Sequence, residues 1–250
     1  MINQQDKLIS AVGLVRYYAE QCAVDNVTVT LHKGEVLGLL GPNGAGKSTT
    51  MQMLTGNLAP SAGEILINGV DLLEQPRHAK QHIGYLPEQP PVYRDLTVEE
   101  YLHYCARLRA VPHQQRAEAI ERTCERCGLQ AVRKRLIGNL SKGFRQRVGI
   151  AQAILHNPAV VILDEPTVGL DPIQIREIRR LIRELGQEHG IILSTHILPE
   201  VQAVCDRVQI LNRGKTVFND SLQGIPSLEQ VFFDLIFREA ELAEVAEVSA

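Results

Sequence analysis

The chain has 250 residues, with 26 Lys or Arg against 29 Asp or Glu, and its net charge is −3. This length allows one large domain or two small ones, which would bury about three quarters of the surface exposed by the unfolded chain. The nearly balanced charge excludes the basic character of proteins that bind nucleic acid through electrostatics, so no nucleic acid partner is expected.

The amino-terminal residues "MINQQDKLIS" lack a basic segment followed by an apolar run, and no run of about 18 apolar residues occurs in the chain. We therefore expect neither a standard secretion signal nor a membrane-spanning helix. The five cysteines do not indicate a disulfide framework and suit a reducing cytosol. Cys124 and Cys127 form an isolated CxxC, which we interpret as chance spacing in a helix, with zinc or redox use as the alternative.

The first predicted elements are strands. Residues 25–31 ("DNVTVTL") alternate apolar and polar side chains, as in a half-buried strand, whereas residues 36–40 ("VLGLL") form the continuous apolar run of a fully buried strand. Residues 63–72 ("GEILINGVDL") alternate again around an Asn-Gly turn. These patterns predict an antiparallel sheet near the amino end.

The segment "GPNGAGKST" follows strand 36–40 directly and fits the phosphate-binding pattern GxxxxGK[ST]. Its glycines let consecutive backbone N–H groups surround phosphate oxygens, and the helix that follows presents its amino end to the anion. Lys47 is expected to reach the β and γ phosphates, and Ser48 to bind Mg²⁺. The predicted nucleotide-binding residues of this loop are Gly41, Pro42, Asn43, Gly44, Ala45, Gly46, Lys47, Ser48 and Thr49.

Apolar residues fall at helical spacing between Thr97 and Gly138, interrupted at Pro112 and Gly128, which predicts a mainly helical insertion. From Ser141 onward, helices and apolar strands alternate as in βαβ units, which predicts a parallel sheet and an α/β fold. The predicted elements of this part are a helix over 141–156, a strand over 159–164, a helix over 173–188 and strands over 190–195 and 207–211.

Acidic side chains follow the strand "VVILD", which ends in Asp164 and precedes Glu165. At the end of a parallel strand near a phosphate loop, Asp164 is expected to hold Mg²⁺ and Glu165 to polarise an attacking water. Taken alone, such a pair is equally typical of a helix cap. His196 ends the strand "IILSTH", where the alternatives are a structural histidine and a hydrogen bond to the γ-phosphate; the rest of the site favours the second.

An amphipathic pattern near the carboxyl end predicts a helix that packs on the domain, with a dimer contact as the alternative. Ser227 and Gln230 form a capping-box pattern at its start, and the last dozen residues are expected to fray. The apolar face consists of Leu228, Val231, Phe232, Leu235 and Ile236.

The ordered set of motifs resembles the nucleotide-binding domain of ABC (ATP-binding cassette) ATPases. The matching segments are "GPNGAGKST" (Walker A), "LSKGFRQR" (signature), "VVILDEP" (Walker B), "GLDP" (D-loop) and "STH" (H-loop). The resemblance implies a P-loop NTPase core with a mainly parallel sheet, an amino-terminal antiparallel portion and a helical subdomain that carries the signature. It also implies an ATPase domain over residues 8–222, a helical subdomain at about 97–157, and a terminal helix with an acidic tail over 223–250.

In this family two subunits pair head to tail, with ATP between the Walker A of one and the signature of the other. The resemblance therefore assigns Ser141, Lys142 and Gly143 to the partner's ATP, whereas a plain helix cap is the alternative for Ser141. Lys142 and Phe144 replace Gly and Gln of the common LSGGQ signature. Phe144 cannot make amide hydrogen bonds, so no role is assigned to it.

Further assignments follow from the resemblance alone. Glu88 aligns with the Q-loop glutamine and Gln89 lies one residue later, so either is the sensor, and Glu88 is a candidate Mg²⁺ ligand. Tyr18 is expected to stack on adenine, with Tyr17 the second candidate and a structural role the alternative. Asp171 is the expected D-loop aspartate, and it is also positioned to cap a helix before Pro172.

The wording "LSKGFRQRVGIAQAI" and "DEPTVGLDP" is most similar to bacterial ATPases that pair with ABC-2-type permeases, including those of gliding motility and copper-enzyme maturation. The expected function is ATP hydrolysis by a homodimer bound to two Mg-ATP, with Glu165, His196 and Lys47 as catalytic residues. The expected partner is a separate membrane permease, reached from the cytoplasmic face of the cell membrane, and export is the expected direction. The alternatives are an ABC-type ATPase without a transport role and a regulator that has lost hydrolysis.

Overall fold

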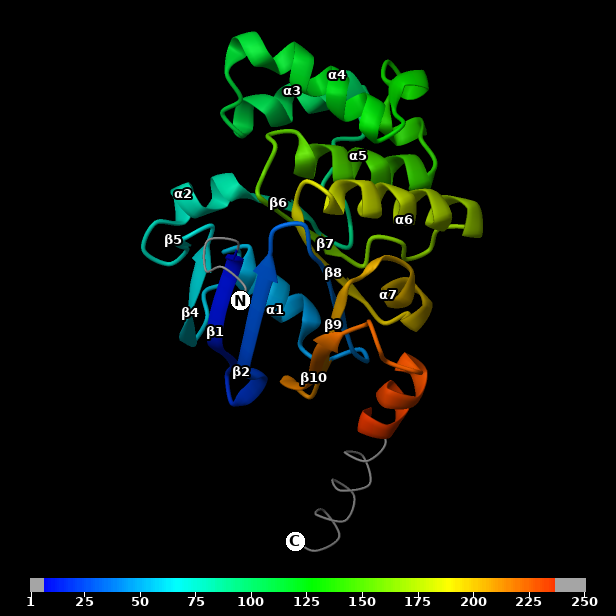
Figure 1. The fold of residues 1–250 in the computed structure, drawn as a ribbon. Coiled ribbons are helices and arrows are strands. Elements are labelled where there is room, and N and C mark those ends of the chain that lie inside the picture. Colours follow the sequence, from blue (N-terminus) through cyan, green and yellow to red (C-terminus); the bar gives the residue numbers. More distant parts are fainter. Residues whose placement is uncertain (1–6, 237–250) are drawn as a thin grey trace, which may run out of the picture.

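Two β-sheets and a group of helices make up residues 7–236, the part of the chain that the computed structural model describes (Figure 1). The first sheet is antiparallel, which confirms the prediction for the amino-terminal region. Its turn at Asn68 and Gly69 has positive φ at both residues, the conformation for which Asn-Gly is favoured. In spatial order the strands are β2 (Gln21–His32), β1 (Lys7–Tyr18), β4 (Ala62–Ile67) and β5 (Val70–Asp71).

The second sheet carries the nucleotide loop and is parallel except for its last strand, as expected for βαβ units. Strand β8 lies between β3, which precedes the phosphate loop, and β7, which ends in Asp164. The carboxyl ends of these strands meet at one edge, where ligands bind in open α/β sheets. In spatial order the strands are β10 (Lys215–Ser221), β9 (Arg207–Asn212), β3 (Val36–Leu40), β8 (Gly190–Thr195), β7 (Val160–Asp164) and β6 (Ile83–Leu86).

The parallel sheet is buried on both faces, because successive side chains of one strand enter different clusters. Val161 and Leu163 of β7 pack with helices α5 (Lys142–Ile154) and α6 (Pro172–Gly186), whereas Val160 and Ile162 pack with α1 (Lys47–Leu54) and the antiparallel sheet. Full burial explains why these strands are continuous apolar runs. Shorter helices α2 (Pro76–Ala79) and α7 (Leu198–Val204) complete the periphery.

Helices α3 (Val98–Leu108) and α4 (Arg116–Arg126) lie above α5 and α6 in Figure 1, which confirms the predicted helical insertion. Thr97 caps α3, and the side chain of Glu100 accepts a hydrogen bond from the Thr97 N–H at 2.8 Å. Short 3₁₀ turns at His113–Gln115, Gln130–Val132 and Ile137–Asn139 connect these helices.

Both cysteines of the CxxC are buried in the cluster formed by α3, α4 and α5. Burial raises the pKa of Cys124 and raises that of Cys127 to about 12, so both remain protonated thiols at neutral pH. Residues 7–236 contain no group of three or more His, Cys, Asp or Glu side chains arranged to hold a metal ion. These surroundings favour the interpretation of the pair as packing residues.

The carboxyl-terminal segment is helical over residues 228–236, and its apolar face packs on Leu40, Val208 and Ile210 of the parallel sheet. The Gln230 N–H donates to the Ser227 hydroxyl at 3.2 Å, as a cap requires. The reciprocal half of the predicted capping box is wrong, because the Gln230 side chain donates to Asp234 instead. The expected fraying of the tail concerns residues outside those described, and none of the helices within residues 7–236 has the length and apolarity needed to cross a membrane.

Candidate functional site: a nucleotide cavity and a separate signature surface

The phosphate loop connects β3 to α1, and two of its glycines are required by close backbone contacts. A Cβ atom at Gly41 would lie 2.3 Å from the Leu211 carbonyl oxygen, and one at Gly46 would lie 2.8 Å from the Ala23 carbonyl oxygen. Gly46 also has φ of 97° and begins α1 without a side-chain cap. The first N–H groups of α1 are therefore free of side-chain competition, and an anion at this helix end can accept hydrogen bonds from them.

Lys47 is the buried cation of this loop, with 6% of its surface exposed. Its Nζ atom donates to the Gly41 carbonyl at 2.8 Å and to the Pro42 carbonyl at 3.1 Å. Burial lowers the pKa of Lys47, and the negative charges of Glu165 and Asp164 partly oppose this effect. The ammonium group is thus held between the phosphate loop and the two carboxylates.

A cavity of 680 Å³ opens in front of the loop, a volume within the usual range for small-molecule sites. Tyr18 lines this cavity and is 45% exposed, and Arg16 covers one face of its ring at 5.1 Å from the centroid. The other face remains for stacking. Of the two tyrosines considered from the sequence, Tyr18 is the one at the cavity. The predicted residues that line it are Tyr18, Asn43, Gly44, Ala45, Gly46, Lys47, Ser48, Thr49, Glu88, Glu165 and His196.

Asp164 and Glu165, at the end of β7, are both held by Ser194 of the neighbouring strand β8. The Ser194 hydroxyl donates to Asp164 Oδ1 and accepts a hydrogen bond from the Glu165 N–H at 3.0 Å. Glu165 has a positive φ of 47°, a conformation that costs a non-glycine residue on the order of 1 kcal/mol. The serine hydroxyl offsets part of this cost, because it gives the Glu165 N–H a partner.

His196 contacts Glu165 directly, with its Nδ1 atom 3.0 and 3.1 Å from the two carboxylate oxygens. Since a carboxylate only accepts, Nδ1 carries the proton in this contact. Nε2 is then left on the side of the ring that faces away from Glu165. About half of the His196 side chain is exposed, whereas Glu165 is largely buried, so the pair presents the histidine toward the cavity.

The signature residues lie at the start of α5, away from the nucleotide cavity of the same chain. Ser141 caps α5 by accepting a hydrogen bond from the Phe144 N–H at 3.3 Å, and Asp171 caps α6 through the N–H groups of Ile173 and Gln174. A cavity of 330 Å³ between these two helix starts is lined by Ser141, Gly143, Phe144 and Asp171, among others. This cavity and the nucleotide cavity have no lining residue in common.

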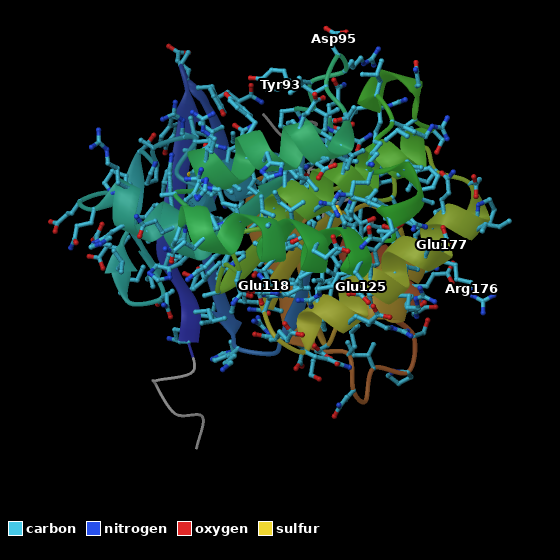
Figure 2. All side chains as sticks on the ribbon, turned by 90° about the horizontal axis from the view of Figure 1, so that it is seen from above. Tyr93, Asp95, Glu118, Glu125, Arg176 and Glu177 are labelled. Carbon is cyan, nitrogen blue, oxygen red and sulfur yellow. The ribbon has the colours of Figure 1, made fainter. Side chains whose placement is uncertain are left out.

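Two signature residues contact other parts of their own chain. The Lys142 amine extends toward Gly169, where a Cβ atom would lie 2.2 Å from Nζ, and so toward the loop after β7. Phe144 is half-buried against the helical cluster, with the Arg147 guanidinium 5.6 Å from its ring centroid. The Arg147 side chain also pairs with Glu177 of α6, which is labelled in Figure 2. Phe144 thus packs beside Arg147, the residue that joins α5 to α6 through its ion pair.

The two Q-loop candidates occupy different positions. Glu88 lines both the nucleotide cavity and a second cavity of 340 Å³. Gln89 lines the second of these cavities and not the first. Lys142 and Gln146 of α5 line that second cavity too. Glu88 is therefore nearer to the phosphate loop, and the segment connects the nucleotide cavity to the signature helix.

Three further residues of the site were not selected from the sequence: Ser194, Thr195 and Glu200. Ser and Thr before His196 resemble ordinary strand residues, so their hydroxyl contacts to the β7 loop carry no sequence signal of their own. Glu200 lies four residues after His196, and only the structure brings it back to Thr195 and Thr167.

Comparisons with known proteins agree with this geometry. Residues 24–168 match the family model described as ABC transporter. The chain is 40% identical to the bacitracin transport ATP-binding protein BcrA of Bacillus licheniformis, over 83% of this chain and 68% of that protein. It is 36% identical to the lipopolysaccharide export system ATP-binding protein LptB of Haemophilus influenzae, over 90% of this chain and 95% of that protein.

A solved structure of the ATP-binding subunit of an ABC transporter superposes with a TM-score of 0.82 at 32% identity, covering 92% of this chain and 99% of that one. The sheet order, the motif positions and these relatives agree on one assignment. The chain belongs to the ABC transporter family, as one of the ATP-binding ATPase subunits that drive transport.

Proposed function

We propose that two copies of the chain close head to tail around two Mg-ATP and that hydrolysis drives a separate ABC-2-type membrane permease. The observation that carries the dimer is that Ser141 and Gly143 line a cavity that shares no residue with the nucleotide cavity of the same chain. A second copy brings its Ser141, Lys142 and Gly143 to the open side of the first copy's ATP. Asp171, which caps the helix beside Gly143, then lies at the contact between copies.

Within each site we assign Glu165 as the general base that orients the attacking water, because its carboxylate lies beside the cavity and is positioned by His196. Lys47 and His196 stabilise the charge that develops on the γ-phosphate. Tyr18 stacks on adenine. Loss of hydrolysis is not favoured, since each of these side chains is present and in place.

The oxygen donors near the phosphate loop suit Mg²⁺, which prefers carboxylate, hydroxyl and water ligands. Ser48 is exposed at the start of α1, the Asp164 carboxylate lies near the Lys47 ammonium, and Glu88 lines the same cavity. We propose that Ser48 and Asp164 hold the ion, with Glu88 as the third candidate. The bound ion supplies charge neutralisation at the β and γ phosphates.

We further propose that residues 8–222 form the ATPase domain, with a helical subdomain over about 97–157 and an extension over 223–250. The permease is a different polypeptide, and we place its contact at residues 88–105, with the ATPase at the cytoplasmic face of the membrane. Export is supported by the similarity to LptB of a lipopolysaccharide export system, and the type of permease by the sequence of the signature segment. Co-purification of the chain with a polytopic membrane protein is expected; a complex made only of water-soluble proteins would favour an ATPase without a transport role.

The test of the catalytic assignment is Glu165→Gln. This variant is expected to abolish steady-state hydrolysis and to accumulate as an ATP-bound dimer, because the amide cannot accept the proton of the attacking water. Light scattering coupled to gel filtration, with and without Mg-ATP, measures the dimer. Unchanged hydrolysis in the variant would exclude Glu165 as the base, and an ATP-bound species of monomer mass would exclude the proposed dimer.

A further inference from the structure

Glu200 is a buried carboxylate that none of the assignments above uses. It lies in the first turn of α7 and has 2% of its surface exposed. Burial raises the pKa of Glu200, and a hydrogen bond from Thr195 opposes that shift. Acidic side chains are rarely buried this completely unless they are paired, so the contacts of Glu200 indicate its purpose.

Each carboxylate oxygen of Glu200 has its own partner: one lies in the loop after β7 and the other at the end of β8. The Thr167 hydroxyl donates to Oε1, and the Thr195 hydroxyl donates to Oε2 at 2.6 Å. Both threonines are buried, with 3% and 0% exposed. Thr167 lies two residues after Glu165, and Thr195 directly precedes His196. One carboxylate therefore connects the segment that carries the base to the segment that carries the histidine.

The bridge is one of three successive links between these segments. Ser194 bonds to Asp164 and to the Glu165 N–H, Thr195 reaches Thr167 through Glu200, and His196 contacts Glu165 itself. The Thr195 oxygen also accepts from the Ile197 N–H at 3.0 Å, so its proton is directed at Glu200. Ser194 and His196 bond to the loop at Asp164 and Glu165. Within residues 7–236, Glu200 is the side chain that bonds to the loop at Thr167.

We propose that Glu200 is a positioning residue for hydrolysis: by tying Thr167 to Thr195, it keeps Glu165 and His196 at hydrogen-bonding distance. The backbone of Glu165 is strained, with φ of 47°. The loop is therefore expected to change conformation when the hydrogen bonds of Glu200 are removed. Glu200 does not line the nucleotide cavity, so it acts through the loop. This inference rests on the proposed roles of Glu165 and His196.

The test compares variants that cut the tie at different atoms. Glu200→Gln keeps the shape but replaces one acceptor oxygen with an NH₂ group, so one threonine hydroxyl loses its acceptor. Thr167→Val removes one donor with little change of volume, and Thr167→Ser retains it. Thr123→Val is the matched control, because Thr123 is a buried threonine with 2% exposed in α4, distant from the site.

In the full-length chain, Glu200→Gln and Thr167→Val are each expected to lower kcat about 10- to 100-fold, the size of effect produced by a small misplacement of catalytic groups. The KM for ATP and the equilibrium affinity for ATP should stay within about twofold of the wild-type values, since the phosphate loop is unchanged. Thr167→Ser restores most of kcat, and the double variant falls no further than the larger single effect. Thr123→Val changes kcat by less than about twofold.

Thermal unfolding separates positioning from stability. If kcat of the folded Thr167→Val variant equals that of the wild type, the proposal is wrong, whether or not Glu200→Gln folds. A weakening of ATP binding as large as the loss of kcat, seen as a higher KM and a lower equilibrium affinity, would also overturn the proposal, because it would show a general defect. A wild type that does not hydrolyse ATP, or that is unaffected by Glu165→Gln, contradicts the proposed function instead; an active wild type with a silent Thr167→Val contradicts only the role of Glu200.

Discussion

Lys47 is a residue whose buried charge destabilises the free protein and favours the binding of a polyanion. Its ammonium is buried between two loop carbonyls and two carboxylates, and burial lowers its pKa. The charge is therefore costly in the free protein and is compensated when a polyanion arrives. Charge-assisted hydrogen bonds to phosphate are about twice as strong as neutral ones, so the cost is recovered on binding.

Lys47→Met is accordingly expected to weaken ATP binding by more than about tenfold, because it removes a charge-assisted contact of about 1.5–3 kcal/mol. The free energy of unfolding should not fall, since an apolar side chain replaces a buried cation of similar length. Titration calorimetry and urea unfolding measure the two effects. Lys33→Ala, at an exposed turn position, is the control and should leave both values unchanged. A stable variant with normal ATP affinity would remove Lys47 from the site.

His156 is a buried histidine whose protonation should oppose folding. Its Nε2–H donates to the Ile83 carbonyl at 3.2 Å, and its Nδ1 atom is buried without a partner. Burial, with a smaller effect of the nearby Arg109 charge, lowers the pKa of His156 from 6.5 to about 4. Between these two values the unfolded chain binds more protons than the folded one. Stability is therefore fully present above pH 6.5 and declines as the pH falls toward 4.

From these values, the wild type should lose about 2 kcal/mol through His156 between pH 7.5 and pH 5. His156→Gln keeps a donor for the Ile83 carbonyl but does not titrate, so it should lose correspondingly less over the same interval. Urea unfolding at both pH values gives the comparison. Burial also lowers the pKa of His189, and its share of the pH dependence remains in the variant. Identical pH dependence in wild type and variant would contradict a neutral buried His156.

At the scale of elements, the sequence predicted best the strands whose side chains are buried on both faces of the sheet. Strands β3, β7 and β8 are buried on both faces, and their apolar runs matched the structure within one residue. Strand β1 was not recognised, because bulges between Ala11 and Tyr17 shift its pairing and break the alternation. A pattern of period two cannot detect a strand whose register changes.

Residues of the site also differ in how well the sequence predicts them. Residues of the contiguous motifs were identified because each motif carries its chemistry within a few positions, as in the loop from Gly41 to Thr49. The hydrogen bonds of Glu200 were not predicted, since Thr167 and Glu200 are 33 positions apart and come together when β7 and β8 pair. The orientation of Phe144 was also beyond the sequence, because it depends on the packing of α5 against the helical cluster.

The two capped helices α5 and α3 allow the structural and functional roles of Ser141 to be separated. Ser141 and Thr97 each accept a hydrogen bond from the N–H three residues later. Ser141→Ala and Thr97→Ala should each cost about 1 kcal/mol of stability, the usual value of a lost cap. Only Ser141→Ala should also lower ATP hydrolysis, while ATP binding by the monomer is retained. If both variants lowered hydrolysis equally, Ser141 would be a structural cap alone.

At the scale of the whole molecule, the phosphate loop and the signature cap lie in different cavities. The nucleotide cavity is formed by the loop after β3 and the ends of β7 and β8, and the signature cavity by the starts of α5 and α6. In the dimer proposed above, a single copy supplies half of each of two sites. Two-fold symmetry follows from that proposal, because each site takes its Walker A and base from one copy and its signature from the other.

Subunit mixing tests that arrangement. Lys47→Met disables the Walker A of its own copy, and Gly143→Asp places a negative charge where the partner's γ-phosphate arrives. Each variant alone should be inactive. A mixed dimer, however, contains one site with an intact Walker A from the second copy and an intact signature from the first. With random pairing, mixing equal amounts should restore hydrolysis to about a quarter of the wild-type rate if one site suffices.

A second mixture controls for nonspecific recovery. In a dimer of Lys47→Met and Glu165→Gln copies, one site lacks its lysine and the other lacks its base, because Lys47 and Glu165 act in the same site. This mixture should therefore remain inactive, although its copies pair as well as in the first mixture. Recovery in the first mixture alone establishes that the signature acts across the dimer. Recovery in neither, with mixed dimers detected by differential tagging, would mean that the signature of this chain serves a different contact.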